Sequence, residues 1–153
     1  MVAHAFGKIT LFFAAGAIYT AAKKTELSQL RGIGRRMPWT MAAFTIGALS
    51  MIGVPPTAGF VSKWYLGLGT IESGQWLLLT VLLVSSLLNI AYLLPIPMRA
   101  FFGKPKDGTV HTRMREAPAS CLVAMIITSL ACLVMFFYPE PFYRLATAIA
   151  GAQ

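Results

Sequence analysis

The fold is decided by residues 53–63, which read Gly-Val-Pro-Pro-Thr-Ala-Gly-Phe-Val-Ser-Lys. Two adjacent prolines remove two backbone N–H donors, so an unbroken helix cannot pass through them. The chain is nevertheless mainly apolar on both sides of the prolines, across residues 39–52 and 60–68. We therefore predict one discontinuous membrane element of two half-helices that is broken at Pro55-Pro56, with Lys63 just past the break. The predicted helix-break residues are Gly53, Pro55, Pro56 and Gly59.

Three further apolar stretches lie outside this element, at residues 2–22, 75–102 and 117–138. Each is long enough to cross a hydrocarbon core, which takes about 17–25 residues, and each must be helical because lipid offers no hydrogen bonds to a backbone. The chain is 57% hydrophobic and only 12% charged, about half the charge of a soluble domain. We predict an all-α integral membrane protein with about four spans, forming a single transmembrane domain over residues 1–153, with an amphipathic tail near its end.

The net charge of +8 is concentrated in two connecting segments, residues 23–37 and 99–116. They hold ten of the thirteen Lys and Arg residues, whereas residues 72–75 between the second and third spans hold none. This asymmetry predicts a multi-pass protein of the cell (inner) membrane whose two basic loops are cytoplasmic. The first loop has no Phe, Tyr or Trp, and the second has only Phe101 and Phe102 near its start, so aromatic stacking residues do not alternate with the basic ones and no nucleic-acid partner is expected. We expect residues 32–34, Gly-Ile-Gly, to break any helix in the first basic loop.

Only three ionisable side chains are predicted at membrane depth, and they are His4, Lys8 and Lys63. A charged lysine there is unfavourable by a few kcal/mol or more, so such residues usually face a bundle interior or a water-filled path for ions or protons. Burial disfavours the charged form of lysine, which allows proton exchange. The residues alone leave an alternative open, in which the prolines only kink the helix, Lys63 reaches the headgroups and His4 lies at the interface.

Ser62 and Asn89 are candidates for the polar lining of such a path, although Asn89, Ser85 and Ser86 are more often hydrogen-bonding groups between helices than ligands. Cys121 and Cys132 are eleven residues apart in one span, about 16 Å along a helix, and cannot form a disulfide. No nucleotide loop, metal-spaced Cys/His cluster or hydrolase arrangement occurs. We therefore predict no catalytic residues, metal site or cofactor.

Four segments carry a resemblance to a known family, and they follow one another in order along nearly the whole chain. They are residues 4–16 (His-Ala-Phe-Gly-Lys, then Leu-Phe-Phe and Gly), residues 32–38 (Gly-Ile-Gly-Arg-Arg-Met-Pro), residues 53–64 and residues 85–95 (Ser-Ser-Leu-Leu-Asn-Ile-Ala-Tyr-Leu-Leu-Pro). The sequence resembles the antiporter-like proton-conducting membrane subunits, which include the D component of the Mrp cation/proton antiporters and the large membrane-arm subunits of respiratory complex I. Residues 55–64 and 89–95, with Glu116-Ala117-Pro118, look more like the Mrp D component.

The resemblance implies roles for the three ionisable residues. The lysine that matches Lys63 lies on a broken helix in a half-channel, and the residues that match His4 and Lys8 lie along a hydrated central axis. Family members are about three times longer, so the chain matches their last four helices and is expected to be a fragment, a split gene product or a truncated relative. The implied partners are other membrane subunits, the lipid bilayer, protons and Na⁺ or K⁺.

The preferred hypothesis is a subunit or fragment of a membrane cation/proton antiporter that moves protons through lysine and histidine relays. One alternative is a complex I-like or hydrogenase-linked proton-pumping subunit, and another is a structural or assembly subunit without conduction. A quinone-binding or catalytic membrane subunit has the least support, and a chromophore bound to the purified protein would revive it.

Overall fold

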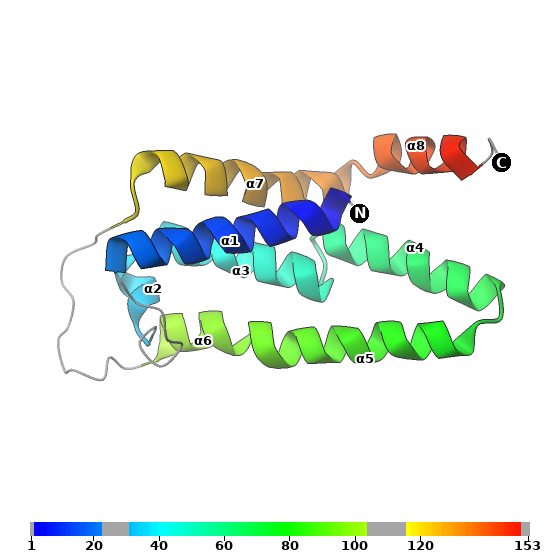
Figure 1. Ribbon diagram of the computed structural model, residues 1–153, viewed down its shortest axis with the longest axis horizontal. Helices are drawn as coiled ribbons and strands as arrows, with labels where there is room; N and C mark the ends of the chain where they lie inside the picture. Colours follow the sequence, from blue (N-terminus) through cyan, green and yellow to red (C-terminus); the bar gives the residue numbers. More distant parts are fainter. Residues whose placement is uncertain (1, 23–30, 104–115, 151–153) are drawn as a thin grey trace.

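The computed structural model describes residues 2–22, 31–103 and 116–150, and all the regular elements in these residues are α-helices (Figure 1). Most of both basic loops therefore lies outside the described residues. The helices are α1 (Val2–Ala22), α2 (Ile33–Arg36), α3 (Pro38–Ile52), α4 (Ala58–Glu72), α5 (Trp76–Leu93), α6 (Pro95–Phe102), α7 (Ala119–Phe137) and α8 (Glu140–Ala150). The predicted all-α membrane fold is confirmed.

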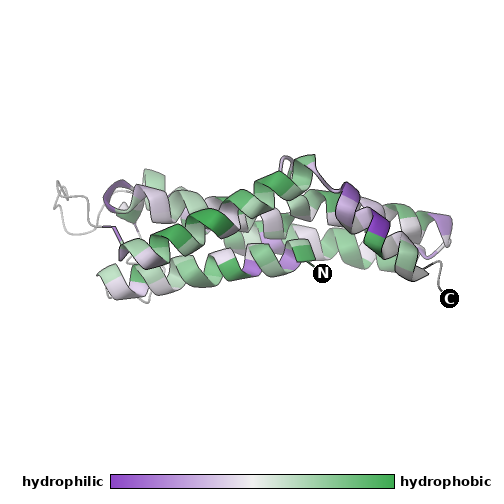
Figure 2. Cartoon of the chain, turned by 90° about the horizontal axis from the view of Figure 1, so that it is seen from above, coloured by the Kyte–Doolittle hydropathy of each residue, from purple (hydrophilic) through white to green (hydrophobic). Residues whose placement is uncertain are grey.

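Three segments are long and apolar enough to cross a membrane: 20 residues of α1, the 27 residues of Trp76–Phe102 that contain α5, Leu94 and α6, and the 19 residues of α7. The 15 residues of α3 reach only about 22 Å, less than a hydrocarbon core of about 30 Å. The fourth crossing therefore needs both α3 and α4, which confirms the predicted discontinuous second span. Figure 2 shows hydrophobic residues over most of the length of these helices.

The core of the bundle is formed where α1, α3 and α7 pack together (Figure 1). Gly7, Thr10, Ala14 and Ala17 are buried, and their spacing of three or four places them on one face of α1. A Cβ on Gly47 of α3 would lie 3.2 Å from the Thr10 side chain, so the two helices approach closely. Small residues at the contact allow this approach, as is common between membrane helices.

One end of the molecule carries α2 and α6, which pack against each other. The Gly32 N–H donates to the Arg99 carbonyl oxygen at 3.2 Å. Gly32 has a φ of 76° and breaks the chain as predicted, but a short helix begins directly afterwards and includes Gly34. The prediction that residues 32–34 break any helix is therefore wrong for Gly34, which needs to be small because a Cβ there would lie 2.8 Å from the Phe101 ring.

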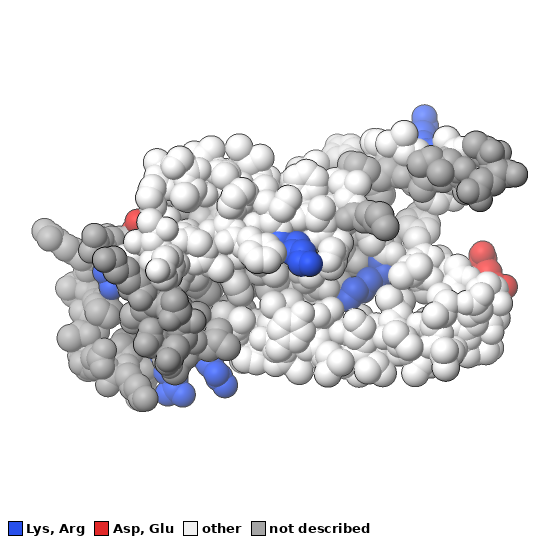
Figure 3. Space-filling model, viewed as in Figure 1, with Lys and Arg blue, Asp and Glu red and all other residues white. Residues whose placement is uncertain are grey.

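The Lys and Arg residues are distributed unevenly between the two ends of the bundle. Figure 3 shows Lys and Arg atoms gathered at the end where α2 and α6 lie, others midway along the molecule and others on α8, with Asp or Glu atoms at both ends. The turn between α4 and α5 lies at the opposite end and has no Lys or Arg (Figure 1). The described arginines at the α2–α6 end are Arg31, Arg35, Arg36 and Arg99.

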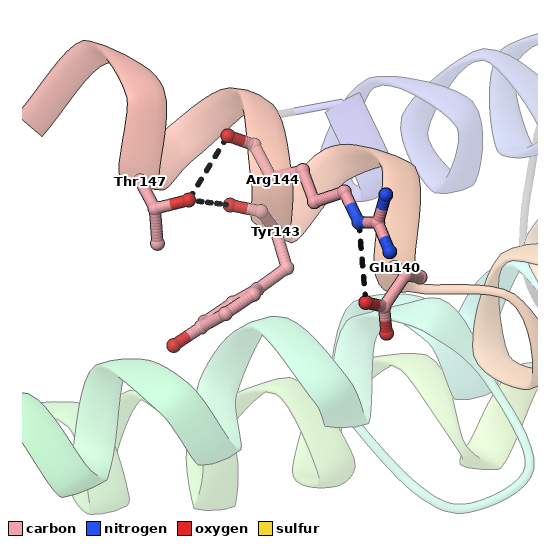
Figure 4. Close-up of polar contacts among 4 residues, drawn as sticks. All are labelled: Glu140, Tyr143, Arg144 and Thr147. Atoms are coloured by element: carbon pink, nitrogen blue, oxygen red, sulfur yellow. Dashed lines mark hydrogen bonds and ion pairs between the residues drawn. The ribbon is translucent and has the colours of Figure 1, made fainter.

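Two shorter helices, α6 and α8, follow α5 and α7 after a break in the helix. The third span is divided at Leu94, because Pro95 and Pro97 have no N–H to continue the helical ladder. After α7, the predicted tail forms α8, whose Tyr143 ring lies 5.3 Å from the ring of Tyr65 on α4. Figure 4 shows Tyr143 directed toward the ribbon of α4, while Arg144 turns back along its own helix to Glu140.

Candidate functional site

The helix break between α3 and α4 is a short, well-bonded turn. Gly53 ends α3 with a φ of 84°, and its N–H donates to the Leu49 carbonyl oxygen at 2.8 Å. The Thr57 hydroxyl, which is buried, donates to the Val54 carbonyl oxygen at 2.7 Å. The residues around the prolines therefore satisfy much of their own backbone, and α4 begins at Ala58.

Gly53 and Gly59, the two glycines predicted at the break, are each required to be glycine for a different structural reason. A Cβ on Gly59 would overlap the carbonyl oxygen of Ser50, so α4 crosses directly against the backbone of α3. A Cβ on Gly53 would lie 2.7 Å from Cδ of Lys63, and its positive φ also favours glycine. Gly53 thus leaves the space through which the Lys63 side chain passes.

Lys63 lies in the second turn of α4 and reaches back across the break. Its Nζ donates to the Ile52 carbonyl oxygen at 2.7 Å and to the Ser86 hydroxyl oxygen at 2.9 Å. The last carbonyl groups of a helix have no partner within it and carry the negative end of the helix dipole. The Lys63 ammonium therefore neutralises the end of α3, and it joins α3, α4 and α5 at one point. The side chain is half-buried, so part of it stays accessible from outside the bundle.

The polar partner of Lys63 on α5 is Ser86, which was not among the predicted lining residues. Ser62 is exposed, and its hydroxyl donates to the Ala58 carbonyl oxygen of its own helix at 3.3 Å. Asn89 is half-buried and accepts a hydrogen bond from the Tyr92 hydroxyl at 2.7 Å. Neither side chain bonds to Lys63 in the described structure, so their role as lining stays a prediction.

His4 and Lys8 share one face of α1, as their spacing predicts, and both are exposed. Neither forms a hydrogen bond or ion pair with the described residues, and neither is joined to Lys63 by such a contact. The structure thus places the three predicted relay residues in two environments. Lys63 is held by neighbouring helices, whereas His4 and Lys8 face outward from this chain.

A buried polar cluster lies behind the break, where α1, α3 and α7 meet. The Cys132 thiol faces the hydroxyls of Ser50 and Thr10, and all three side chains are almost completely buried. The Thr10 hydroxyl donates to the Phe6 carbonyl oxygen at 2.8 Å, whereas the Ser50 hydroxyl has no hydrogen-bond partner in the described residues. Both cysteines, Cys121 and Cys132, are free thiols on α7. Within the described residues, no three His, Cys, Asp or Glu side chains are grouped as metal ligands.

Comparison with known protein families assigns the chain to one of them. Residues 1–89 match the family described as NADH:quinone oxidoreductase/Mrp antiporter, TM. The chain belongs to this family. The prediction made from the four sequence segments is thus confirmed, and both branches that it named occur among the similar proteins.

Curated relatives in the family include NADH-quinone oxidoreductase subunit N of Desulforudis audaxviator, which is 39% identical over 150 residues covering 92% of this chain and 30% of that protein. F(420)H(2) dehydrogenase subunit N of Methanosarcina mazei is 32% identical, with coverage of 97% and 31%. The chain therefore spans about a third of the length of the curated relatives it matches.

Solved structures of similar proteins include the Mrp complex from Dietzia sp. DQ12-45-1b, with a TM-score of 0.80, 22% identity and coverage of 92% of this chain and 34% of that one. At this identity the likeness shows the fold alone. Respiratory complex I from Thermus thermophilus matches with a TM-score of 0.65 at 27% identity, over 88% of this chain and 31% of that one. The two curated relatives are thus named as subunits, and the two solved structures are named as complexes.

Proposed function

We propose that this chain is part of a membrane cation/proton antiporter subunit, and that Lys63 takes up and releases protons in a hydrated half-channel beside the helix break. The observation that carries the proposal is the position of Lys63 Nζ, 2.7 Å from the unpaired end of α3 and 2.9 Å from Ser86. Family membership supports it, because the relatives belong to antiporter and respiratory assemblies.

The physical argument concerns the cost of a charge at this depth. An ammonium in hydrocarbon is unfavourable by a few kcal/mol or more, and two hydrogen bonds and the negative end of α3 offset part of this cost. Unwound backbone at membrane depth is tolerated where protein or a water-lined cavity satisfies it. A half-buried lysine at such a break can therefore be charged when bonded and can lose its proton to water without rupturing the fold.

Lys8 and His4 are proposed to continue the path along α1. They lie four residues apart on one exposed face, and a charged lysine facing lipid chains would be expensive. We propose that this face borders a hydrated axis in the assembled protein. Ser62 and Asn89 are assigned a weaker role as polar lining, since neither bonds to Lys63 here.

Two energy sources could drive proton movement through this chain. Cation/proton antiport would use a gradient of Na⁺ or K⁺, whereas a complex I-like or hydrogenase-linked subunit would be driven by electron transfer in partner subunits. The names of several relatives favour the second candidate, including NADH-quinone oxidoreductase subunit N and, at 30% identity, hydrogenase-4 component B of Escherichia coli. In both cases this chain acts as a transporter-type subunit of the cell membrane, with the α2–α6 end proposed to face the cytoplasm and no redox cofactor of its own.

A structural or assembly role without conduction is the remaining candidate, and the observation that favours it is coverage. The chain spans about 30% of its relatives, so its four crossings need not contain a complete path. A scaffold requires packed helices but not a titrating Lys63, and this difference makes the two functions separable by experiment.

The test uses vesicles from native membranes that carry Lys63→Ala, Lys63→Gln or Arg144→Ala. Proton movement is followed with a pH-sensitive dye while Na⁺ gradients, K⁺ gradients and electron donors are supplied in turn. We expect both Lys63 variants to lose proton movement, because glutamine retains hydrogen-bond donors but cannot titrate. Arg144→Ala, which removes an exposed charge on α8, should behave as wild type.

Assembly is measured on the same membranes by blue-native electrophoresis. Loss of proton movement with an intact complex supports the relay. Wild-type movement in either assembled Lys63 variant overturns it and favours the scaffold. Proton movement in wild-type vesicles that is driven by a Na⁺ or K⁺ gradient indicates antiport, whereas proton movement driven by electron donors indicates electron-driven pumping.

A further inference from the structure

We propose that Ser86 is a positioning residue that keeps Lys63 in the same place in both of its protonation states. The inference rests on the proposed function, since it concerns how the proton-carrying lysine is held. It adds a residue on α5 to a site otherwise built from the break between α3 and α4.

Ser86 has the hydrogen-bond geometry that a charged lysine needs. Its hydroxyl oxygen accepts from Lys63 Nζ at 2.9 Å, and its own hydrogen is directed to the Leu82 carbonyl oxygen at 2.9 Å. An ammonium has three donors and no acceptor, whereas a hydroxyl has one donor and two lone pairs. Toward charged Lys63, Ser86 must therefore act as the acceptor, and Leu82 provides a second place for the serine hydrogen.

The same pair also fits the neutral amine. When Lys63 gives one proton to water, Nζ keeps two hydrogens and gains a lone pair. One hydrogen remains bonded to the Ile52 carbonyl oxygen, and the Ser86 hydroxyl can rotate its hydrogen from Leu82 to Nζ. The Leu82 carbonyl group loses only an additional bond, because it remains an acceptor within its helix. Ser86 keeps its own proton throughout, and no heavy atom has to move.

The other observed partner of Lys63 cannot make this exchange. The Ile52 carbonyl oxygen accepts hydrogen bonds but has no hydrogen to donate. On α5, Ser85 is exposed and Asn89 is bonded to Tyr92. The hydroxyl of Ser86 is thus the contact of Lys63 that can reverse its direction when the proton leaves.

The experiment uses the same native complex in vesicles, with Ser86→Ala, Ser86→Val, Ser86→Thr and Ser85→Ala compared with Lys63→Ala. Threonine and valine have nearly the same shape, so their comparison isolates the hydroxyl. Without it, proton movement should fall about tenfold near neutral pH. Its pH profile should move about one unit toward lower pH, because the charged lysine loses a stronger hydrogen bond than the neutral amine does. Ser86→Thr should restore both quantities to within about twofold of wild type, and Ser85→Ala should change neither.

The outcomes separate this inference from the proposed function. If Lys63→Ala abolishes proton movement while assembled Ser86→Val and Ser86→Thr share the wild-type rate and pH profile, the inference is overturned and the function stands. If Lys63→Ala retains proton movement, both are overturned. A uniform loss of rate in valine and threonine variants, with an unchanged pH profile, also overturns the inference, because it indicates a packing effect rather than loss of the hydroxyl.

Discussion

Glu116 forms a carboxylate clasp at the start of α3, and its removal should measurably destabilise the bundle. Its Oε1 accepts from the Trp39 N–H at 3.0 Å, and its Oε2 accepts from the Thr40 hydroxyl at 2.8 Å. The first N–H groups of a helix lack partners within it, and a negative charge there interacts favourably with the helix dipole. Met37 precedes α3 and supplies no side-chain cap, so the cap comes from a residue 76 or 77 positions away.

The expected magnitude follows from these two bonds. Replacing a helix-capping side chain by alanine costs about 0.5–2 kcal/mol. Thr40 is completely buried, and a buried hydroxyl without an acceptor costs about 1–3 kcal/mol. The Trp39 bond is solvent-exposed and is counted at the low end, and Thr40 can turn to a backbone carbonyl of the preceding turn. We therefore expect Glu116→Ala to lower the free energy of unfolding by about 2 kcal/mol.

The assay is reversible unfolding of the purified chain in mixed micelles, followed by circular dichroism. Glu116→Gln retains one acceptor oxygen and should lose about half as much. The matched control is Glu72→Ala, which removes an exposed carboxylate from the last turn of α4 and should change stability by about 0.5 kcal/mol or less. If Glu116→Ala is no more destabilising than Glu72→Ala, the clasp contributes nothing and the reasoning is refuted.

Two other substitutions test the packing of the break and the surface of α8. Gly59→Ala would bring a Cβ into the Ser50 carbonyl oxygen and should lower the free energy of unfolding by more than about 3 kcal/mol or prevent assembly. Gly69→Ala lies in open space on the same helix and should be neutral or stabilising by about 0.5–1 kcal/mol. Equal stabilities of the two variants in the micelle assay would contradict the close crossing of α3 and α4. Arg144→Ala should change the unfolding free energy by less than about 0.5 kcal/mol, because its ion pair with Glu140 is exposed on both sides, and a loss above about 1 kcal/mol would argue against this assignment.

The broken span could be predicted because its cause is local. Pro55 and Pro56 lack the donors that a helix needs, and the apolar residues on both sides require the chain to stay in the membrane. The clasp at α3 was not predictable in this way. Glu116 follows a basic segment in the sequence, and only the packing of α7 against α3 brings it to Trp39 and Thr40.

The candidate site shows the same limit at shorter range. The sequence identified Lys63 beside the break and several polar residues on the third span, but the choice among them depends on the register between α4 and α5. That register is fixed by the tight turn at residues 73–75 and by side-chain packing, and it places Ser86 rather than Asn89 against Lys63. Periodicity gives the face of one helix but not its height relative to the next.

The difference between Lys63 and Lys8 also bears on how the chain is oriented in its assembly. Lys63 finds its partners within the chain, while Lys8 and His4 are exposed on α1. α5 packs against α3, α4 and α6 and carries large exposed apolar side chains, with Leu77 at 78% and Leu87 at 65%. Lipid chains can cover α5 at no electrostatic cost, but they would penalise a charged Lys8 by several kcal/mol or more. The charges therefore favour an arrangement in which α1 faces water or neighbouring protein and α5 faces lipid.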